Sequence, residues 1–202
     1  MRALILSLVL AIAAAGAHAA PPAIPDAFSL GNPKAKIRVE AYASLSCTHC
    51  AHFNNEIFPA FKKKYIDTGK VHYVFRDFLA GPPDLAAAGA LLARCAGKDR
   101  YFTVGDAIFH AQTEIFSTGD IRGPLLRIAE TAGMNEDQFN KCVGDEKALA
   151  AFNARVEKYS KEAKIEGTPT FFFGTDRYDK GELSMAEIDV AYAKALAASK
   201  KK

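Results

Sequence analysis

Two cysteines separated by two residues, in the segment Cys47-Thr48-His49-Cys50, carry the strongest chemical signal in this 202-residue chain. Thiol–disulfide exchange needs a thiolate nucleophile and a second cysteine that can resolve the mixed disulfide. A strand pattern runs directly into Cys47 and a helical pattern follows, so we expect Cys47 at a helix N-terminus with its sulfur exposed, where free N–H groups favour the thiolate. The spacing predicts a redox pair in which Cys47 attacks, Cys50 resolves and His49 stabilises the thiolate.

The sequence gives weaker support to other roles for the residues of this motif. Covalent haem needs a histidine directly after the second cysteine, and Ala51 stands there. The cysteines and histidines of residues 47–52 are a candidate zinc site, yet four ligands so close in sequence rarely surround one ion. We therefore predict no metal and no cofactor, with a purely structural disulfide as the alternative to redox chemistry. His52 is expected at the surface, and His72 and His110 as structural residues.

A second pair of cysteines, Cys95 and Cys142, lies in a block with helical spacing and no strand pattern, residues 84–164. Asn135 and Gln138 are placed there like the two partners of a helix start. Neither cysteine has a neighbouring cysteine, so we predict that they join in a structural disulfide, with a second redox centre as the alternative. The closed loop is worth on the order of 4 kcal/mol in the chain-entropy model.

The N-terminus has the pattern of a signal peptide. Met1-Arg2 gives a positive start, an apolar run of residues 3–15 follows, and small residues precede a cut that we place after Ala19. The run is too short to span a bilayer. We expect export to the periplasm, where disulfides persist. The chain carries 26 Lys and Arg against 23 Asp and Glu, a balance too even for nucleic acid to be the main partner.

The segments around the first cysteine pair predict a βαβ unit. Residues 37–43 alternate in the manner of a strand, and residues 70–78 have strand composition. Between them an apolar residue recurs every four positions from Phe53 to Tyr65, which predicts a helix that Pro59 should kink. A connection of this length places the second strand parallel to the first.

Strand patterns return after the helical block. Residues 170–173 predict a buried strand, and residues 174–181 a turn with a short edge strand. Ser184 and Glu187 form a capping box that opens a final helix. The order βαβ, helical block, ββα predicts one α/β domain with an all-helical insertion.

The chain resembles the DsbA-like thiol:disulfide interchange proteins of bacteria, and most of all the alphaproteobacterial-type members with a second cysteine pair. The resemblance rests on four segments: residues 40–50, 75–78, 92–97 and 167–172. It implies a thioredoxin fold with an inserted helical domain, a catalytic Cys47, a resolving Cys50 and a substrate-binding loop at Thr168 and Pro169, with a cis bond before Pro169. It also implies a Cys47 pKa of roughly 4.

The domain boundaries follow from these patterns together. We assign residues 1–19 to a signal peptide, 20–27 to an N-terminal arm, 28–82 to the first part of the thioredoxin fold, 83–164 to the helical insertion and 165–202 to the second part of the fold.

Two positions depart from the family's pattern. Thr48 stands where the family usually has proline, and Ala41 stands where an acidic residue often lies under the disulfide and relays protons. Glu40 is one position earlier, so strand alternation points it to the opposite face from Ala41. The sequence therefore leaves open whether Glu40 takes over the proton relay.

The resemblance implies a periplasmic oxidase that donates the Cys47–Cys50 disulfide to reduced exported proteins and is reoxidised by a DsbB-like membrane protein linked to quinones. Since only a short segment precedes the first long strand, we expect a monomer. A disulfide isomerase or reductase is the alternative within the same chemistry. An exported binding or scaffold protein with purely structural disulfides is the alternative outside it.

Overall fold

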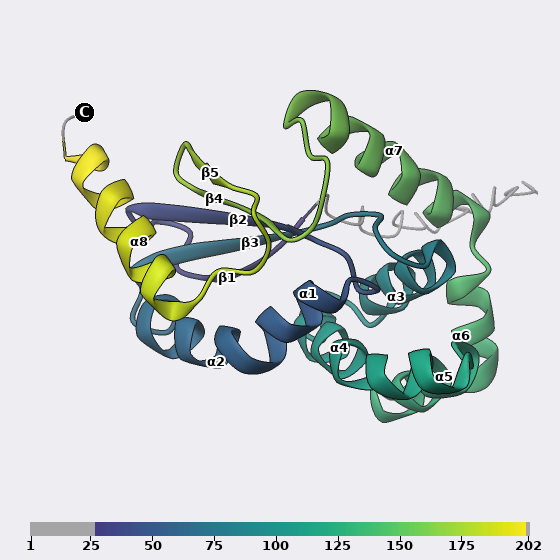
Figure 1. The fold of residues 1–202 in the computed structure, drawn as a ribbon. Helices are drawn as coiled ribbons and strands as arrows, with labels where there is room; N and C mark the ends of the chain where they lie inside the picture. The colour runs from purple at the N-terminus through teal and green to yellow at the C-terminus, as the bar shows by residue number, and fades with distance from the viewer. Residues whose placement is uncertain (1–26, 201–202) are drawn as a thin grey trace, which may run out of the picture.

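The computed structural model describes residues 27–200, so the expected signal peptide and almost all of the expected arm lie outside the described residues. Five strands form one sheet in the order β1-β3-β2-β4-β5 (Figure 1). The strands are β1 (Phe28–Gly31), β2 (Ile37–Ala43), β3 (Val71–Asp77), β4 (Thr170–Phe173) and β5 (Asp176–Tyr178). β2 and β3 are parallel and the other neighbouring pairs are antiparallel. The predicted βαβ unit and the later strand pair are confirmed.

The connection between β2 and β3 is helical but not regular. It consists of α1 (Thr48–His52), a π-helical turn (Phe53–Ile57), α2 (Phe58–Phe61) and a second π-helical turn (Lys62–Ile66). Pro59 stands in the first turn of α2. Proline has no N–H and crowds the preceding turn, so the helix is interrupted there, as its position predicts.

One face of the sheet is covered by this connection and by the last helix, α8 (Met185–Ser199) (Figure 1). The apolar spacing seen in the sequence serves this contact, because Phe53, Phe61 and Tyr65 are buried. The Tyr65 ring lies with its centroid 4.5 Å from that of Tyr192 on α8. The predicted capping box begins α8 at Ser184.

The helical insertion separates β3 from β4. It contains α3 (Pro83–Cys95), α4 (Tyr101–Thr118), α5 (Arg122–Thr131), α6 (Glu136–Val143) and α7 (Glu146–Glu162). No strand occurs between residues 84 and 164, as the sequence predicts. Asn135 and Gln138 cap α6 reciprocally. The sheet and the helical insertion lie side by side, with α1 at their boundary (Figure 1).

The end of α7 returns to the other face of the sheet. Its Tyr159 ring packs edge-on to Tyr42 of β2, with ring centroids 5.3 Å apart, and Tyr42 also meets Phe172 of β4. With Phe78 and Ile165 these residues form a second, smaller apolar cluster. Both faces of β2 are thus covered, which suits the central strand that carries the cysteine motif.

A buried ion pair joins the sheet to the insertion. Asp77, the last residue of β3, accepts a hydrogen bond of 2.8 Å from Nε of Arg94 on α3, and a second from the hydroxyl of Tyr101 on α4. Asp77 is 3% exposed and Arg94 5%. A buried charge needs such partners, so this cluster fixes how the two parts meet.

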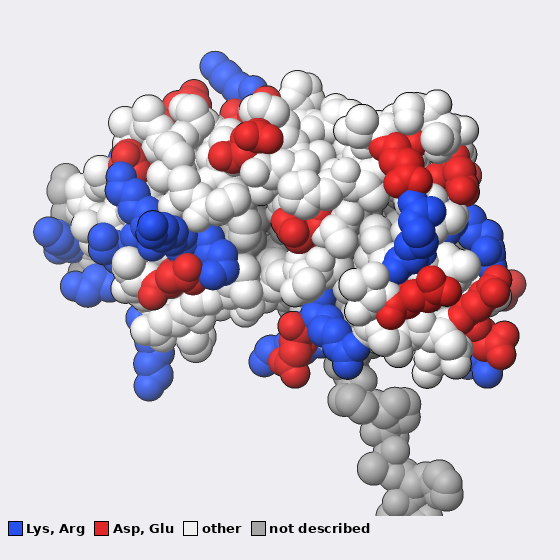
Figure 2. Space-filling view, turned by 90° about the horizontal axis from the view of Figure 1, so that it is seen from below, with Lys and Arg blue, Asp and Glu red and all other residues white. Residues whose placement is uncertain are grey.

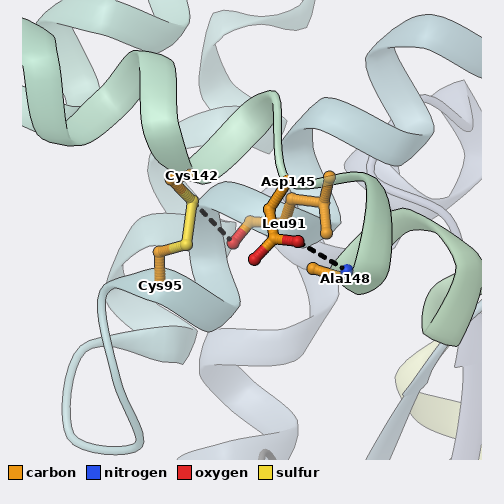
Figure 3. The surroundings of a disulfide bond; sticks show 5 residues. All are labelled: Leu91, Cys95, Cys142, Asp145 and Ala148. Atoms are coloured by element: carbon orange, nitrogen blue, oxygen red, sulfur yellow. Dashed lines mark hydrogen bonds between the residues drawn. A yellow bond between two sulfur atoms is a disulfide. The ribbon is translucent and has the colours of Figure 1, made fainter.

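A disulfide closes the insertion on itself. Cys95, the last residue of α3, is bonded to Cys142 on α6, with Cα atoms 6.2 Å apart. Figure 3 shows the bond beside the junction of α6 and α7, where the Cys142 sulfur lies 3.3 Å from the Leu91 carbonyl oxygen. At the same junction Asp145 caps α7 by accepting a hydrogen bond from the Ala148 N–H.

Charged side chains of both signs occur on the face of the molecule that Figure 2 shows. Lysine and arginine side chains gather at the end of the molecule where α2 and α8 lie, and both signs are mixed over the insertion (Figure 2). Lys63 and Lys64, at the end of the helical connection between β2 and β3, are exposed. Within residues 27–200, every helix falls short of the length and apolar character needed to cross a bilayer.

Candidate active site

The backbone around the first cysteine pair presents N–H groups to Cys47. Cys47 is the N-cap of α1, with extended φ and ψ angles of −85° and 123°, and its sulfur accepts a hydrogen bond of 3.3 Å from the N–H of Cys50. Both cysteines are free thiols. β2 ends at Ala43, four residues before Cys47, so Cys47 lies at the start of the helix that follows the end of this strand.

The two thiols differ in acidity. A hydrogen bond from the Cys50 side chain is the largest cause that lowers the pKa of Cys47 to about 6, and contacts with Thr168 and the backbone N–H groups of Cys50 and His49 add to it. Burial of Cys47 works in the opposite direction. For Cys50 burial prevails and raises the pKa of the thiol well above its ordinary value. The thiolate of the reduced pair therefore lies on Cys47.

The structure corrects two expectations for Cys47. Its pKa is higher than the value of roughly 4 that the resemblance implies, because burial disfavours the charged form. Its sulfur is also less open than expected: Cys47 is 9% exposed, against 2% for Cys50. The Thr168 carbonyl oxygen lies 3.3 Å from the Cys47 sulfur.

The loop at Thr168 and Pro169 faces the cysteines across the sheet. The bond between these two residues is cis. They directly precede β4, which pairs antiparallel with β2 so that Thr170 lies opposite Tyr42 near the end of β2. This register carries Thr168 past the end of β2 to Cys47, although 121 positions separate the two residues in the sequence.

The histidines of the motif meet a carboxylate that the sequence analysis missed. Nδ1 of His49 lies 2.6 Å from one oxygen of Glu182, and Nδ1 of His52 lies 3.5 Å from the other. His52 is exposed, as expected, and so is His110, whereas His72 is partly buried on β3. Glu182 belongs to the loop before α8, and nothing in its local sequence indicates this contact.

The proposed role of His49 can be measured. Replacing His49 with alanine is expected to raise the pKa of Cys47 by less than one unit, because alanine keeps the backbone N–H that stabilises the thiolate. The reduction potential should then fall by less than about 30 mV. Glu182→Gln, which keeps a polar partner for the imidazole, serves as the matched variant. A rise of two units in His49→Ala would instead make the imidazole the main stabiliser of the thiolate.

Glu40 lies away from the cysteine pair. Its carboxylate accepts hydrogen bonds of 2.7 Å from Nε of Arg38 and from Nε of Arg76, on the face of the sheet that α7 covers. Ala41, on the opposite face, lines a small cavity with Cys50. Glu40 therefore does not replace the missing acid.

Two serines that the sequence analysis did not single out hold the loop before Cys47. The hydroxyl groups of Ser44 and Ser46 both donate to the Ala80 carbonyl oxygen. Gly81 makes this approach possible: a Cβ there would lie 2.8 Å from the Ser46 carbonyl oxygen, and its φ is +73°. A third support comes from Gln112 of α4, whose amide donates to the carbonyl oxygens of Leu45 and Cys47.

We searched the described residues for groups of side chains that could bind a metal ion. Between residues 27 and 200, no group of three or more His, Cys, Asp or Glu side chains has the arrangement of a metal site. The chemistry of the site is that of two thiols of unequal acidity at a helix start.

Comparison with known proteins places the chain among others with this arrangement. The pattern of a family described as thioredoxin matches residues 24–189. A relative from Rickettsia conorii, named as a protein-disulfide oxidoreductase, is 36% identical over 174 residues, which cover 86% of this chain and 61% of that protein. A second from Rickettsia bellii is 37% identical and covers 86% and 66%. The chain thus spans about two thirds or less of the length of the curated relatives it matches.

Solved structures agree with the sequence matches. A crystal structure of a variant of alpha-DsbA1 from Wolbachia pipientis superposes with a TM-score of 0.75 at 30% identity, over 87% of this chain and 96% of that one. BdbD from Bacillus subtilis, in its oxidised form, gives a TM-score of 0.73 at 20% identity, over 87% and 96%, and supports the fold alone. The chain belongs to the thioredoxin family and, within it, to the DsbA-like proteins.

Proposed function

We propose that this protein is a thiol:disulfide oxidase that donates the Cys47–Cys50 disulfide to reduced exported proteins. The observation that carries the proposal is the position of Cys47 as the N-cap of α1, where its sulfur accepts the Cys50 N–H at 3.3 Å. This position lowers the pKa of Cys47, while burial raises that of Cys50. The names of the Rickettsia relatives support the same chemistry.

The reaction uses the two sulfurs in sequence. A substrate thiolate attacks the Cys47 sulfur of the oxidised pair, and Cys50 leaves and takes up a proton because the pKa of its thiol is high. A second substrate thiolate then attacks the substrate sulfur of the mixed disulfide and expels Cys47 as a thiolate. Low leaving-group pKa speeds this second step. The substrate gains a disulfide and the enzyme is left with two thiols.

The acidity of Cys47 sets the direction of exchange. With a pKa of about 6 against an ordinary value of 9.0, ionisation stabilises the reduced form at pH 7 by about one unit, or roughly 1.4 kcal/mol. This free energy raises the reduction potential of the Cys47–Cys50 pair by about 30 mV, which makes the protein a stronger oxidant. A pKa of 4 would raise the potential by about 90 mV. Since the folded pKa is depressed, this stabilisation is complete above the ordinary pKa and is lost as pH falls through 6.

The remaining assignments extend this proposal. We propose that the loop at Thr168 and Pro169 binds the substrate chain beside Cys47; the distance of 3.3 Å between the Thr168 carbonyl oxygen and the Cys47 sulfur supports this role. We propose that residues 1–19 direct the protein to the periplasm, that residues 83–164 form an inserted domain between the two parts of the thioredoxin fold, and that the mature protein acts as a monomer. The reoxidant would be a DsbB-like membrane protein that passes electrons to quinone.

Disulfide transfer tests the function directly. Oxidised protein is mixed with a reduced, unfolded test protein, quenched with acid and assayed for free thiols. We expect one disulfide to move per molecule at a rate far above that of small-molecule disulfides. Failure to transfer it, with the Cys47–Cys50 bond intact, would contradict the proposal and favour a structural disulfide.

The second disulfide is expected to stabilise the protein without taking part in transfer. Replacing Cys95 and Cys142 with serine should lower the Tm of the oxidised protein, through a loss of at most about 4 kcal/mol. Transfer by the first pair should stay within a fewfold of the parent. Should the double variant keep its Tm and lose turnover, the two cysteines would have to be a second redox centre.

A further inference from the structure

The loop before Cys47 packs against the helical insertion through Leu45. Leu45, which is 3% exposed, enters beside two glycines of the insertion. A Cβ on Gly89 of α3 would lie 3.2 Å from the Leu45 Cβ, and one on Gly105 of α4 would lie 3.7 Å from its Cδ2. The lack of a side chain at Gly89 gives Leu45 its place. The residue two positions before Cys47 therefore packs against two helices of the insertion.

Gln112 of α4 holds the backbone of the same loop. Its Nε2 donates hydrogen bonds to the Leu45 carbonyl oxygen at 2.8 Å and to the Cys47 carbonyl oxygen at 3.3 Å. Gln112 is 4% exposed. Leu45 lies between the end of β2 and the start of α1, outside the regular pairing of both elements, so its buried carbonyl needs a donor from elsewhere.

The Cys47 carbonyl oxygen accepts a second hydrogen bond in addition to the one from Gln112. The Cys47 carbonyl oxygen also accepts the N–H of Ala51 at 3.0 Å, which is the first bond of the helix that starts after Cys47. Gln112 thus donates to the same carbonyl oxygen that accepts the first backbone hydrogen bond of α1. Its other amide atom, Oε1, is buried with no hydrogen-bond partner among the described residues. The side chain therefore acts on this loop as a donor.

We propose that Gln112 is a positioning residue for the nucleophile: by holding the carbonyls on both sides of Ser46, it fixes the first turn of α1 so that its N–H groups face the Cys47 sulfur. The inference rests on the proposed role of Cys47. It gives the helical insertion a part in the redox chemistry, because the residue that aligns the thiolate comes from α4. A methionine of similar length would fill the space but supply no donor.

The test is the Gln112→Met variant of the reduced full-length protein, in which Cys47 is titrated by its thiolate absorbance and by its rate of alkylation. We expect the midpoint to rise by about half a unit or more, so that the thiolate fraction at pH 5 falls about threefold. The matched control is Ile115→Val, which trims a buried side chain of the same helix and should leave the titration unchanged while lowering the Tm.

Two results would overturn the inference. One is a Gln112→Met variant with a lower Tm and an unchanged Cys47 titration, which would make Gln112 a packing residue only. If that variant does not fold, the side-chain amide of Gln112 is followed by NMR in the parent, where we expect it to shift at the Cys47 midpoint; an amide that does not respond is the second contrary result. Neither measurement uses a substrate, so failed disulfide transfer would contradict the proposed function alone.

Discussion

Alkylation of the reduced protein at about pH 6 is expected to modify Cys47 at least about tenfold faster than Cys50. Near its pKa of about 6, half of Cys47 is thiolate, whereas the pKa of Cys50 is raised well above 9.0. The lower intrinsic reactivity of an acidic thiol offsets part of this advantage. The greater exposure of Cys47, 9% against 2%, adds to it. The rate at Cys47 should follow a single titration with its midpoint near pH 6.

Single replacements extend the same prediction to activity. Cys47→Ser should reduce disulfide transfer to the uncatalysed rate, because no attacking or accepting sulfur is left at the helix start. In the Cys50→Ser variant the Cys47 thiolate should still attack a test disulfide and form a mixed disulfide with it. The variant should not release this mixed disulfide, since the resolving sulfur is gone. Mass spectrometry of the alkylated protein identifies the modified residue. Preferential labelling of Cys50 would reverse the assignment of nucleophile and resolving cysteine.

Replacing Asp77 with asparagine is expected to destabilise the protein by about 3–5 kcal/mol, because the charge of Arg94 then stays buried without its anion. Asp77 and Arg94 are 3% and 5% exposed, and the hydroxyl of Tyr101 donates to the same carboxylate. For a chain of this length the loss corresponds to a fall in Tm of roughly 10 °C. Thermal unfolding of the oxidised protein, followed by circular dichroism, measures it.

An exposed ion pair provides the control for this prediction. Glu157 and Lys161 lie 2.5 Å apart on α7, with side chains 66% and 73% exposed, and solvent screens their attraction. Glu157→Gln should therefore leave the Tm close to that of the parent. If Asp77→Asn shifts the Tm no more than Glu157→Gln does, the buried pair is not what joins the sheet to the insertion.

The sequence predicted the elements whose signals are local. The strands at residues 37–43 and 70–78, the helical block and the capping boxes at Asn135 and Ser184 all follow from spacing or from a pair of residues close together in the chain. β1 was missed because it is only four residues long and acquires its partner, β3, from more than 40 positions away.

The site was predicted in part for the same reason. Cys47 and its helix start lie in one short segment, so their arrangement could be inferred from spacing. Glu182 and Gln112 come from distant elements, and only the folded chain shows that they reach His49 and the Cys47 carbonyl. The pKa of Cys47 also depends on its burial, a tertiary property, which is why the expectation of roughly 4 was too low.

The equilibrium of the protein with glutathione tests the central claim most directly. Thiols are counted by acid quench and mass spectrometry over a series of glutathione potentials, so that the Cys47–Cys50 and Cys95–Cys142 pairs are followed separately. A catalytic oxidant pair should open at mildly reducing potentials, while a structural disulfide should stay closed to below about −300 mV. We predict that Cys47–Cys50 opens first and well above that potential. A Cys47–Cys50 pair that remains oxidised until Cys95–Cys142 opens would contradict the account.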